Sequence, residues 1–152
     1  MLKTSPHLTK FVELMDCMHA VREAMKQYVK QRMKENDIDI TFEMFEVLLV
    51  LLRNNNDLNQ QDLALKLRKN KATITSSIDN LSTRGLVVRK TDPSDRRNNK
   101  IELTLQGLKY QEKIQPIING FFEILHKDLQ PEQIQPVNDM LRDMYRDLMN
   151  EI

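Results

Sequence analysis

The sequence predicts a mainly α-helical fold with a small β-hairpin, and two observations carry this prediction. Apolar residues recur at intervals of three and four over most of the chain, which is the period of an amphipathic helix. The period changes to two between residues 86 and 105, where turn-forming residues separate two short segments of strand character. With 152 residues, 40% of them hydrophobic and 30% charged, the chain suits one compact, helix-rich domain over residues 1–152.

The first half of the chain is expected to begin with two helices. A long helix is predicted from Leu8 to about Lys34, and residues 36–42 then interrupt the helical pattern. Thr41 is expected to cap the second helix because its hydroxyl can accept a bond from a free backbone N–H. The predicted apolar stripe of that helix consists of Phe45, Leu48, Leu49 and Leu52.

Two shorter helices are expected next, with a tight connection between them. Asn59 is the expected cap of the first, which places Leu63, Ala64 and Leu67 inward. After a break at residues 68–70, residues 71–85 resume the helical period, with Gly85 in the stop position. The inward residues of this second short helix are Ile74, Ile78 and Leu81. Two short, closely joined helices predict a helix-turn-helix.

A hairpin is predicted directly after the second short helix. Residues 86–90 are rich in β-branched side chains, and residues 92–99 are charged and turn-forming. The second strand is expected to alternate Ile101, Leu103 and Leu105 with polar partners. A hairpin in this place is a wing, so residues 38–106 are predicted to form a winged helix-turn-helix.

The remaining helices are expected to join two copies of the chain. A helix is predicted from about Thr104 to about Lys127, and a last helix follows Pro131. The apolar residues of the last helix have the 3-4 spacing of a packing seam: Ile134, Val137, Leu141, Met144 and Leu148. The winged core is too small to cover these apolar faces, so residues 1–36 and 107–152 are predicted to form a homodimer interface. The alternative is that these helices pack only on each other.

The charge of the chain is concentrated in one segment although the formal net charge is only +1. Residues 66–100 hold 10 Lys or Arg and 3 Asp or Glu, whereas the segments on either side are mildly acidic. Such a distribution is expected when one face meets a polyanion such as duplex DNA. The alternative is a solvated, charged loop.

The second short helix and the wing supply the expected DNA contacts. The helix face opposite the apolar residues carries small hydroxyl and amide side chains, which can approach a base edge or a phosphate closely. The wing carries Arg96 and Arg97, and arginine is a common probe of a narrow minor groove. Asp95 can pair with Arg97 and hold its direction. The predicted DNA-binding residues are Lys71, Thr73, Thr75, Ser76, Asn80, Asp95, Arg96 and Arg97. The alternatives are an ordinary solvated helix face and a surface ion pair of little energetic weight.

This order of motifs resembles the MarR family of bacterial transcription regulators. The resemblance rests on Gly85, Leu86, Val87, Asp95, Arg97, Leu103, Thr104 and Gly107, in that order and spacing. It implies that Arg97 enters the minor groove with Asp95 orienting it, and that Thr75, Ser76 and Asn80 occupy recognition-helix positions that contact DNA. Family members often have arginine where this chain has Ser76 and Asn80. The resemblance also implies an obligate dimer and a small-molecule pocket, expected at the junction of the first, second and fifth helices and suited to a small aromatic effector.

Cys17 is the chain's single cysteine, and the same resemblance leaves two interpretations of it open. Some relatives sense peroxides through a cysteine near the start of the first helix, held by tyrosines. One alignment places Cys17 at that position and another places Leu14 there. Phe42 stands where one of the tyrosines is expected and has no hydroxyl to lower the thiol pKa. The two interpretations are a redox sensor and a small apolar interface residue.

Other classes of function find little support in the sequence. Three glycines leave no phosphate-binding loop, and three histidines have no nucleophile or metal spacing, so we expect neither an enzyme nor a cofactor or metal site. No segment is apolar enough to span a membrane, and the first residues lack a signal-peptide core, so we expect a cytoplasmic protein. A winged-helix module that binds protein rather than DNA stays as the rival function.

Overall fold

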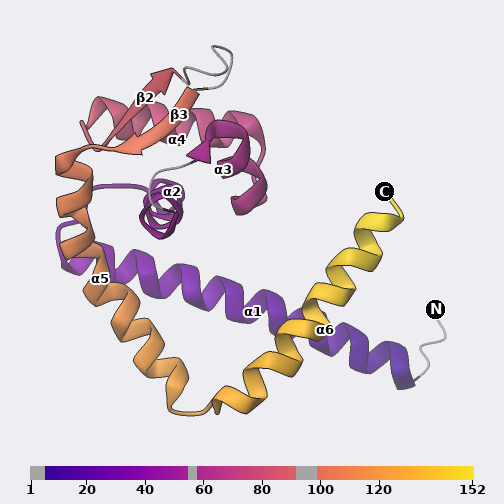
Figure 1. Cartoon of the computed structure of the whole chain (residues 1–152). Helices are drawn as coiled ribbons and strands as arrows, with labels where there is room; N and C mark the ends of the chain where they lie inside the picture. Colours follow the sequence, from indigo (N-terminus) through magenta and orange to yellow (C-terminus); the bar gives the residue numbers. More distant parts are fainter. Residues whose placement is uncertain (1–5, 55–57, 92–98) are drawn as a thin grey trace. The chain divides into compact units, whose positions relative to one another are not determined.

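The computed structural model describes residues 6–54, 58–91 and 99–152, and these form a mainly helical fold with a small antiparallel sheet (Figure 1). The chain divides into two compact units, Met1–Ile117 and Ile118–Ile152. The first unit holds the long helix α1 (Pro6–Glu35), the winged helix-turn-helix and the first half of α5 (Leu105–His126). The second unit holds the end of α5 and the helix α6 (Pro131–Asn150). The predicted fold class is therefore confirmed.

Helix α2 (Phe42–Arg53) forms the centre of the first unit's core. Its expected cap is confirmed, because Thr41 Oγ1 accepts a hydrogen bond from the Met44 backbone N–H at 3.2 Å. The predicted stripe was wrong in part, since Leu49 and Leu52 are only half-buried. The helix is apolar almost all round, so its sequence does not define the centre of the buried face. The side chains buried from α2 are Met44, Phe45, Val47, Leu48 and Leu51.

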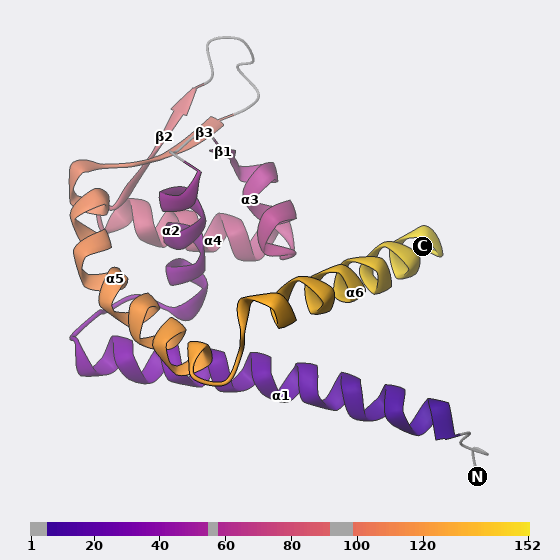
Figure 2. The same cartoon turned by 60° about the horizontal axis from the view of Figure 1, so that its bottom comes forward.

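The helix-turn-helix consists of α3 (Gln60–Leu67) and α4 (Lys71–Thr83), which pack on each other and on α2 (Figure 2). Asn59 caps α3 as expected, in a reciprocal capping box with Asp62. The chain leaves α3 through Arg68, whose φ of 51° is left-handed, and the Lys69 N–H donates back to the Ala64 carbonyl at 3.1 Å. Asn70 then caps α4 by accepting from the Thr73 N–H at 2.8 Å. These two caps fix where each short helix begins.

The wing belongs to a sheet of three strands, β1 (Leu58–Asn59), β2 (Val87–Thr91) and β3 (Asn99–Leu103). The strand order is β1-β3-β2, and both pairings are antiparallel. Strand β1, which no sequence pattern predicted, ties the start of α3 to the wing through the Leu58–Ile101 register. The expected inward place of Leu105 was wrong, because β3 ends at Leu103 and Leu105 is 80% exposed on the first turn of α5.

The corner that joins α4, the wing and α5 depends on two glycines. Gly85 has a φ of 68°, a conformation that most side chains disfavour, and it turns the chain from α4 into β2. Thr104 Oγ1 donates to the Gly85 carbonyl at 2.6 Å and accepts from the Gly107 N–H at 3.0 Å. A Cβ added at Gly107 would lie 2.0 Å from the Leu86 carbonyl oxygen. The absence of a side chain at Gly107 therefore allows α5 to begin against the base of the wing.

The terminal helices carry large apolar side chains that are exposed in the single chain. On α1 these are Leu8, Phe11, Val12, Met18, Val21 and Met25. Within the second unit they include Ile134, Val137, Met140, Tyr145, Leu148 and Met149 on α6. None of the described helices is both long enough and apolar enough to cross a membrane.

Candidate nucleic-acid interface

Helix α4 has one buried face and one polar, solvent-facing face. Ile74, Ile78 and Leu81 have no exposed surface, which confirms the predicted inward face. On the other side, Lys71, Ser76 and Asn80 are exposed, and Thr73 and Thr75 are half-buried. A shallow hollow on this face is lined by Lys71, Ala72, Thr75, Ser76, Asp79 and Asn80. Five predicted DNA-binding residues thus lie on one face, and four of the five line this hollow.

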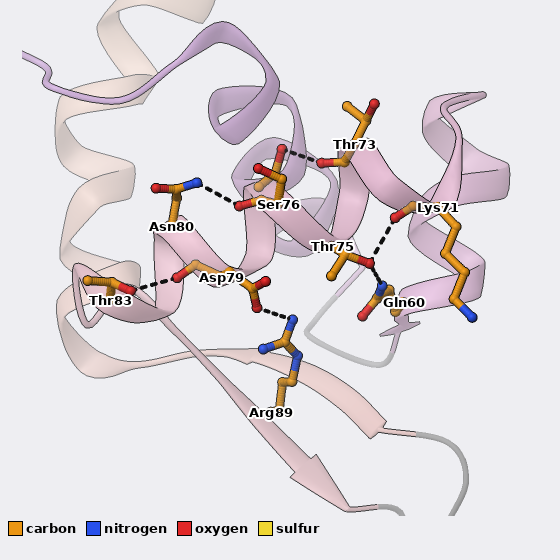
Figure 3. A network of polar contacts seen from close by, with 10 residues as sticks. Gln60, Lys71, Thr73, Thr75, Ser76, Asp79, Asn80, Thr83 and Arg89 are labelled. Carbon is orange, nitrogen blue, oxygen red and sulfur yellow. Dashed lines mark hydrogen bonds and ion pairs between the residues drawn. The ribbon is translucent and has the colours of Figure 1, made fainter.

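Hydrogen bonds within the interface orient several of these side chains (Figure 3). Thr75 Oγ1 donates to the Lys71 carbonyl at 2.8 Å and accepts a bond from Gln60 Nε2 of α3. The hydroxyl hydrogen of Thr75 is thereby used inside the protein, so this residue is suited to accept from a ligand rather than to donate. Asn80 Nδ2 donates to the Ser76 carbonyl at 2.8 Å. An amide has two donor hydrogens and an acceptor oxygen, so this bond leaves Asn80 groups with which to read a base.

An ion pair connects the exposed face of α4 to the wing. Arg89 Nη2 of β2 lies 2.6 Å from Asp79 Oδ1 of α4 (Figure 3). Side chains alternate along a strand, so Arg89 lies on the same side of β2 as the buried Val87. Lys90 points the other way, and its Nζ lies 2.6 Å from Glu102 Oε2 on β3. One ion pair therefore joins the wing to the helix, and the other stays within the wing.

Another ion pair attaches the turn between α3 and α4 to α2. Lys69 Nζ lies 2.9 Å from Glu46 Oε2, and both side chains are largely buried. Glu43 lies in the first turn of α2, and a hydrogen bond from its own backbone N–H lowers the pKa of its carboxyl group. The positive charges of Lys69 and Lys26 act in the same direction, against the effect of burial. Glu46 of α2 thus holds the turn through its ion pair with Lys69.

Three predicted contacts, Asp95, Arg96 and Arg97, lie outside the described residues, so their DNA-binding role stays a prediction. Two residues that sequence reasoning missed are Gln60, which bonds Thr75, and Arg89, which pairs with Asp79. Strand alternation was a signal for Arg89, since it places this residue on the side of Val87. Nothing comparable in the sequence marks Gln60.

Other candidate sites add little to this face. Cys17 is a free, exposed cysteine on α1, and both interpretations of it, a redox sensor and an interface residue, stay predictions. Across residues 6–54, 58–91 and 99–152, no three His, Cys, Asp or Glu side chains form a group that could hold a metal ion. A hollow along the end of α1 is lined by residues of that helix, among them Tyr28 and Gln31. That hollow is not the predicted effector pocket between three helices.

Comparison with known proteins shows which family this geometry resembles. The MarR family model matches residues 46–98, which cover α3, α4 and β2. YdgJ of Bacillus subtilis, an uncharacterized HTH-type transcriptional regulator, is 27% identical over 68% of this chain and 63% of its own length. A putative regulatory protein for the hcr operon of Thauera aromatica is 30% identical over 47% of this chain and 43% of its own. The chain thus spans less than two thirds of the length of these two curated relatives.

The solved structures extend the likeness over most of the chain. MepR of S. aureus in its DNA-binding conformation is 27% identical, with a TM-score of 0.81 over 89% of this chain and 98% of MepR. MepR in a complex with DNA has a TM-score of 0.74 over 87% of this chain and 95% of MepR, at 27% identity. These matches share the helices, the wing and their order, and the family consists of regulators rather than enzymes. This chain therefore resembles the MarR family of winged helix-turn-helix transcriptional regulators, whose family model matches it over residues 46–98.

Proposed function

We propose that this chain regulates transcription by binding a pseudo-palindromic DNA site as a homodimer, with α4 in the major groove and the wing in the adjacent minor groove. The observation that carries the proposal is the exposed polar face of α4, which stands beside the wing while its apolar face is buried. Small hydroxyl and amide groups on such a helix can approach base edges. The complex of MepR with DNA supports this docking mode by likeness.

The distribution of charge supports DNA as the partner. The segment that contains α4 and the wing, residues 66–100, holds 10 basic and 3 acidic residues. A protein that neutralises phosphates releases counterions, so its affinity for DNA falls as salt rises. We expect the basic residues of this segment to set affinity. Ser76 and Asn80 are neutral, so we expect these two residues to set base preference.

Selection of bound duplexes from a random pool tests this function. The purified protein is expected to enrich duplexes with two related half-sites about one helical turn apart, roughly 34 Å. Labelled copies of the enriched duplex are then titrated at rising salt, where affinity is expected to fall linearly on a double logarithmic plot. Enrichment of no sequence and no binding at low salt would overturn the proposal and favour a protein-binding winged helix.

We propose that residues 1–36 and 107–152 form the dimer interface around the DNA-binding part, residues 38–106. The exposed apolar side chains of α1 and α6 support this, since a monomer rarely leaves so much apolar surface uncovered. Light scattering is expected to give twice the 18.0 kDa mass of one chain. Val137→Asp is expected to weaken the dimer, whereas Asn138→Asp, which adds the same charge next to it, is expected to have little effect. A monomeric wild-type protein at micromolar concentration would contradict the proposal.

We further propose that a small aromatic effector modulates DNA binding from the junction of α1, α2 and α5. Support comes from the family and from the aromatic side chains there, where Phe42 stacks on Phe45 with ring centroids 6.3 Å apart. Lys26 Nζ lies 5.6 Å from the Phe42 ring centroid and offers a cation beside it. A panel of phenolic and other aromatic acids is expected to contain members that raise the melting temperature and weaken DNA binding. A panel with no effect on either quantity would remove the proposal.

A further inference from the structure

The Asp79–Arg89 ion pair is placed where it affects DNA recognition more than stability. Its two atoms lie 2.6 Å apart, and the side chains of Asp79 and Arg89 are 55% and 33% exposed. An exposed pair of this kind contributes little to folding. Asp79 also lines the hollow on the DNA-facing side of α4, where a lone carboxylate would repel phosphates.

The pair attaches the wing to α4 at a point away from the corner. At the corner itself, Gly85, Leu86 and Thr104 hold the base of the wing through backbone and hydroxyl hydrogen bonds. Asp79 lies one helical turn before the end of α4, and Arg89 lies two residues beyond the buried Val87. Two separated attachments restrict rotation between a strand and a helix more than one attachment does.

We propose that Asp79 and Arg89 are positioning residues that set sequence discrimination, by fixing the wing relative to α4 so that both engage neighbouring grooves at once. The inference rests on the proposed DNA-binding function. A matched site has the correct groove spacing, so a fixed arrangement of the wing and α4 raises the affinity for it. Random DNA is held mainly through phosphates, and its binding does not depend on that arrangement. Arg89 also neutralises Asp79, which lowers the repulsion that this carboxylate would otherwise exert on DNA.

The proposal makes opposite predictions for matched and random DNA. Asp79→Asn removes a negative charge, so affinity for a random duplex is expected to rise. The same variant frees Arg89 and loosens the wing, so affinity for the selected duplex relative to the random one is expected to fall about two- to fivefold, the range of an exposed ion pair. A residue with a merely structural role would not lower this ratio while random binding rises.

The Lys90–Glu102 pair offers a matched control, because its atoms also lie 2.6 Å apart but it stays within the wing. Glu102→Gln removes the same charge as Asp79→Asn and is expected to leave the affinity ratio unchanged. Arg89→Lys keeps the charge but not the planar fork, so it is expected to restore only part of the ratio that Arg89→Ala loses. Melting temperatures of all variants are expected to stay within about 4 °C of wild type, which follows from the small energy of an exposed pair.

Fluorescence anisotropy with the selected duplex and a random duplex of equal length measures these ratios. An unchanged ratio in a folded, dimeric Asp79→Asn protein would overturn the inference, as would an equal loss in Glu102→Gln. Failure of the wild type to bind either duplex would instead refute the proposed function. The two failures are therefore distinguishable in one experiment.

Discussion

Replacement of Gly107 by alanine tests the packing of α5 against the wing most sharply. The added Cβ would lie 2.0 Å from the Leu86 carbonyl oxygen and 3.1 Å from Leu103 Cδ2, whereas ordinary contacts lie at 3.4–4 Å. The Leu86 oxygen is held in place, because it accepts from the Thr104 N–H at 3.1 Å. The start of α5 must therefore move by more than 1 Å, away from the contacts that define the corner.

The expected cost follows from these contacts. Overpacking of a close contact costs about 1–3 kcal/mol, and a clash with fixed backbone belongs at the upper end. Weakened hydrogen bonds at Thr104 add about 1 kcal/mol, which the better helix propensity of alanine offsets by a similar amount. The free energy of unfolding is thus expected to fall by about 3 kcal/mol, a large share of the stability of a typical domain. The melting temperature is expected to fall by roughly 6–12 °C.

Urea unfolding followed by circular dichroism measures the loss, with Gly85→Ala as the comparison. Gly85 has a φ of 68°, which costs an L-residue about 1–2 kcal/mol, but its nearest added contact is the end of the flexible Gln106 side chain at 3.3 Å. Gly85→Ala is therefore expected to destabilise less than Gly107→Ala. A Gly107→Ala protein with the urea midpoint of wild type would refute the close approach.

Three further substitutions test the helix cap and the DNA contacts. Asn70→Ala removes the side chain that accepts from the Thr73 N–H, so urea unfolding is expected to show a loss of about 1 kcal/mol; an unchanged midpoint would contradict the cap. Arg97→Ala is expected to weaken binding to the selected duplex by roughly 1–3 kcal/mol without loss of helical signal, and wild-type affinity would show that the wing does not dock as proposed. Asn80→Ala is expected to relax base preference in a repeated selection while the salt dependence stays constant, because no charge is lost; a changed salt slope would oppose its role as a base reader.

The local signals of the sequence were sufficient to predict most of the fold. The caps at Thr41 and Asn59, the inward face of α4 and the stop at Gly85 all arise from neighbours in the chain. β1 was missed because it has two residues, and a two-residue strand has no alternation to detect. It exists only through its pairing with β3, about 40 residues later. Leu105 was misplaced for a related reason, since Thr104 ends the strand pattern by starting a helix.

The residues of the candidate site could be predicted from the sequence, but the contacts between them could not. Spacing alone placed Ser76 and Asn80 on the outer face of α4, and the structure keeps them exposed there. The bond from Gln60 to Thr75 depends on how α3 crosses α4, which no local pattern encodes. The same holds for Asp79 and Arg89, because their approach depends on how the wing leaves the corner. Tertiary placement therefore decides which polar residues remain available to DNA.

The central claim is that α4 and the wing form a DNA-binding surface, and the salt dependence of binding tests it most directly. Fluorescence anisotropy of the wild-type protein on the selected duplex is measured from about 50 to 200 mM salt. Neutralisation of several phosphates predicts a linear fall of log affinity with log salt concentration, by a factor on the order of 10³ over this range for about six contacts. Absence of binding at 50 mM salt, or an affinity that does not change with salt, would contradict the claim.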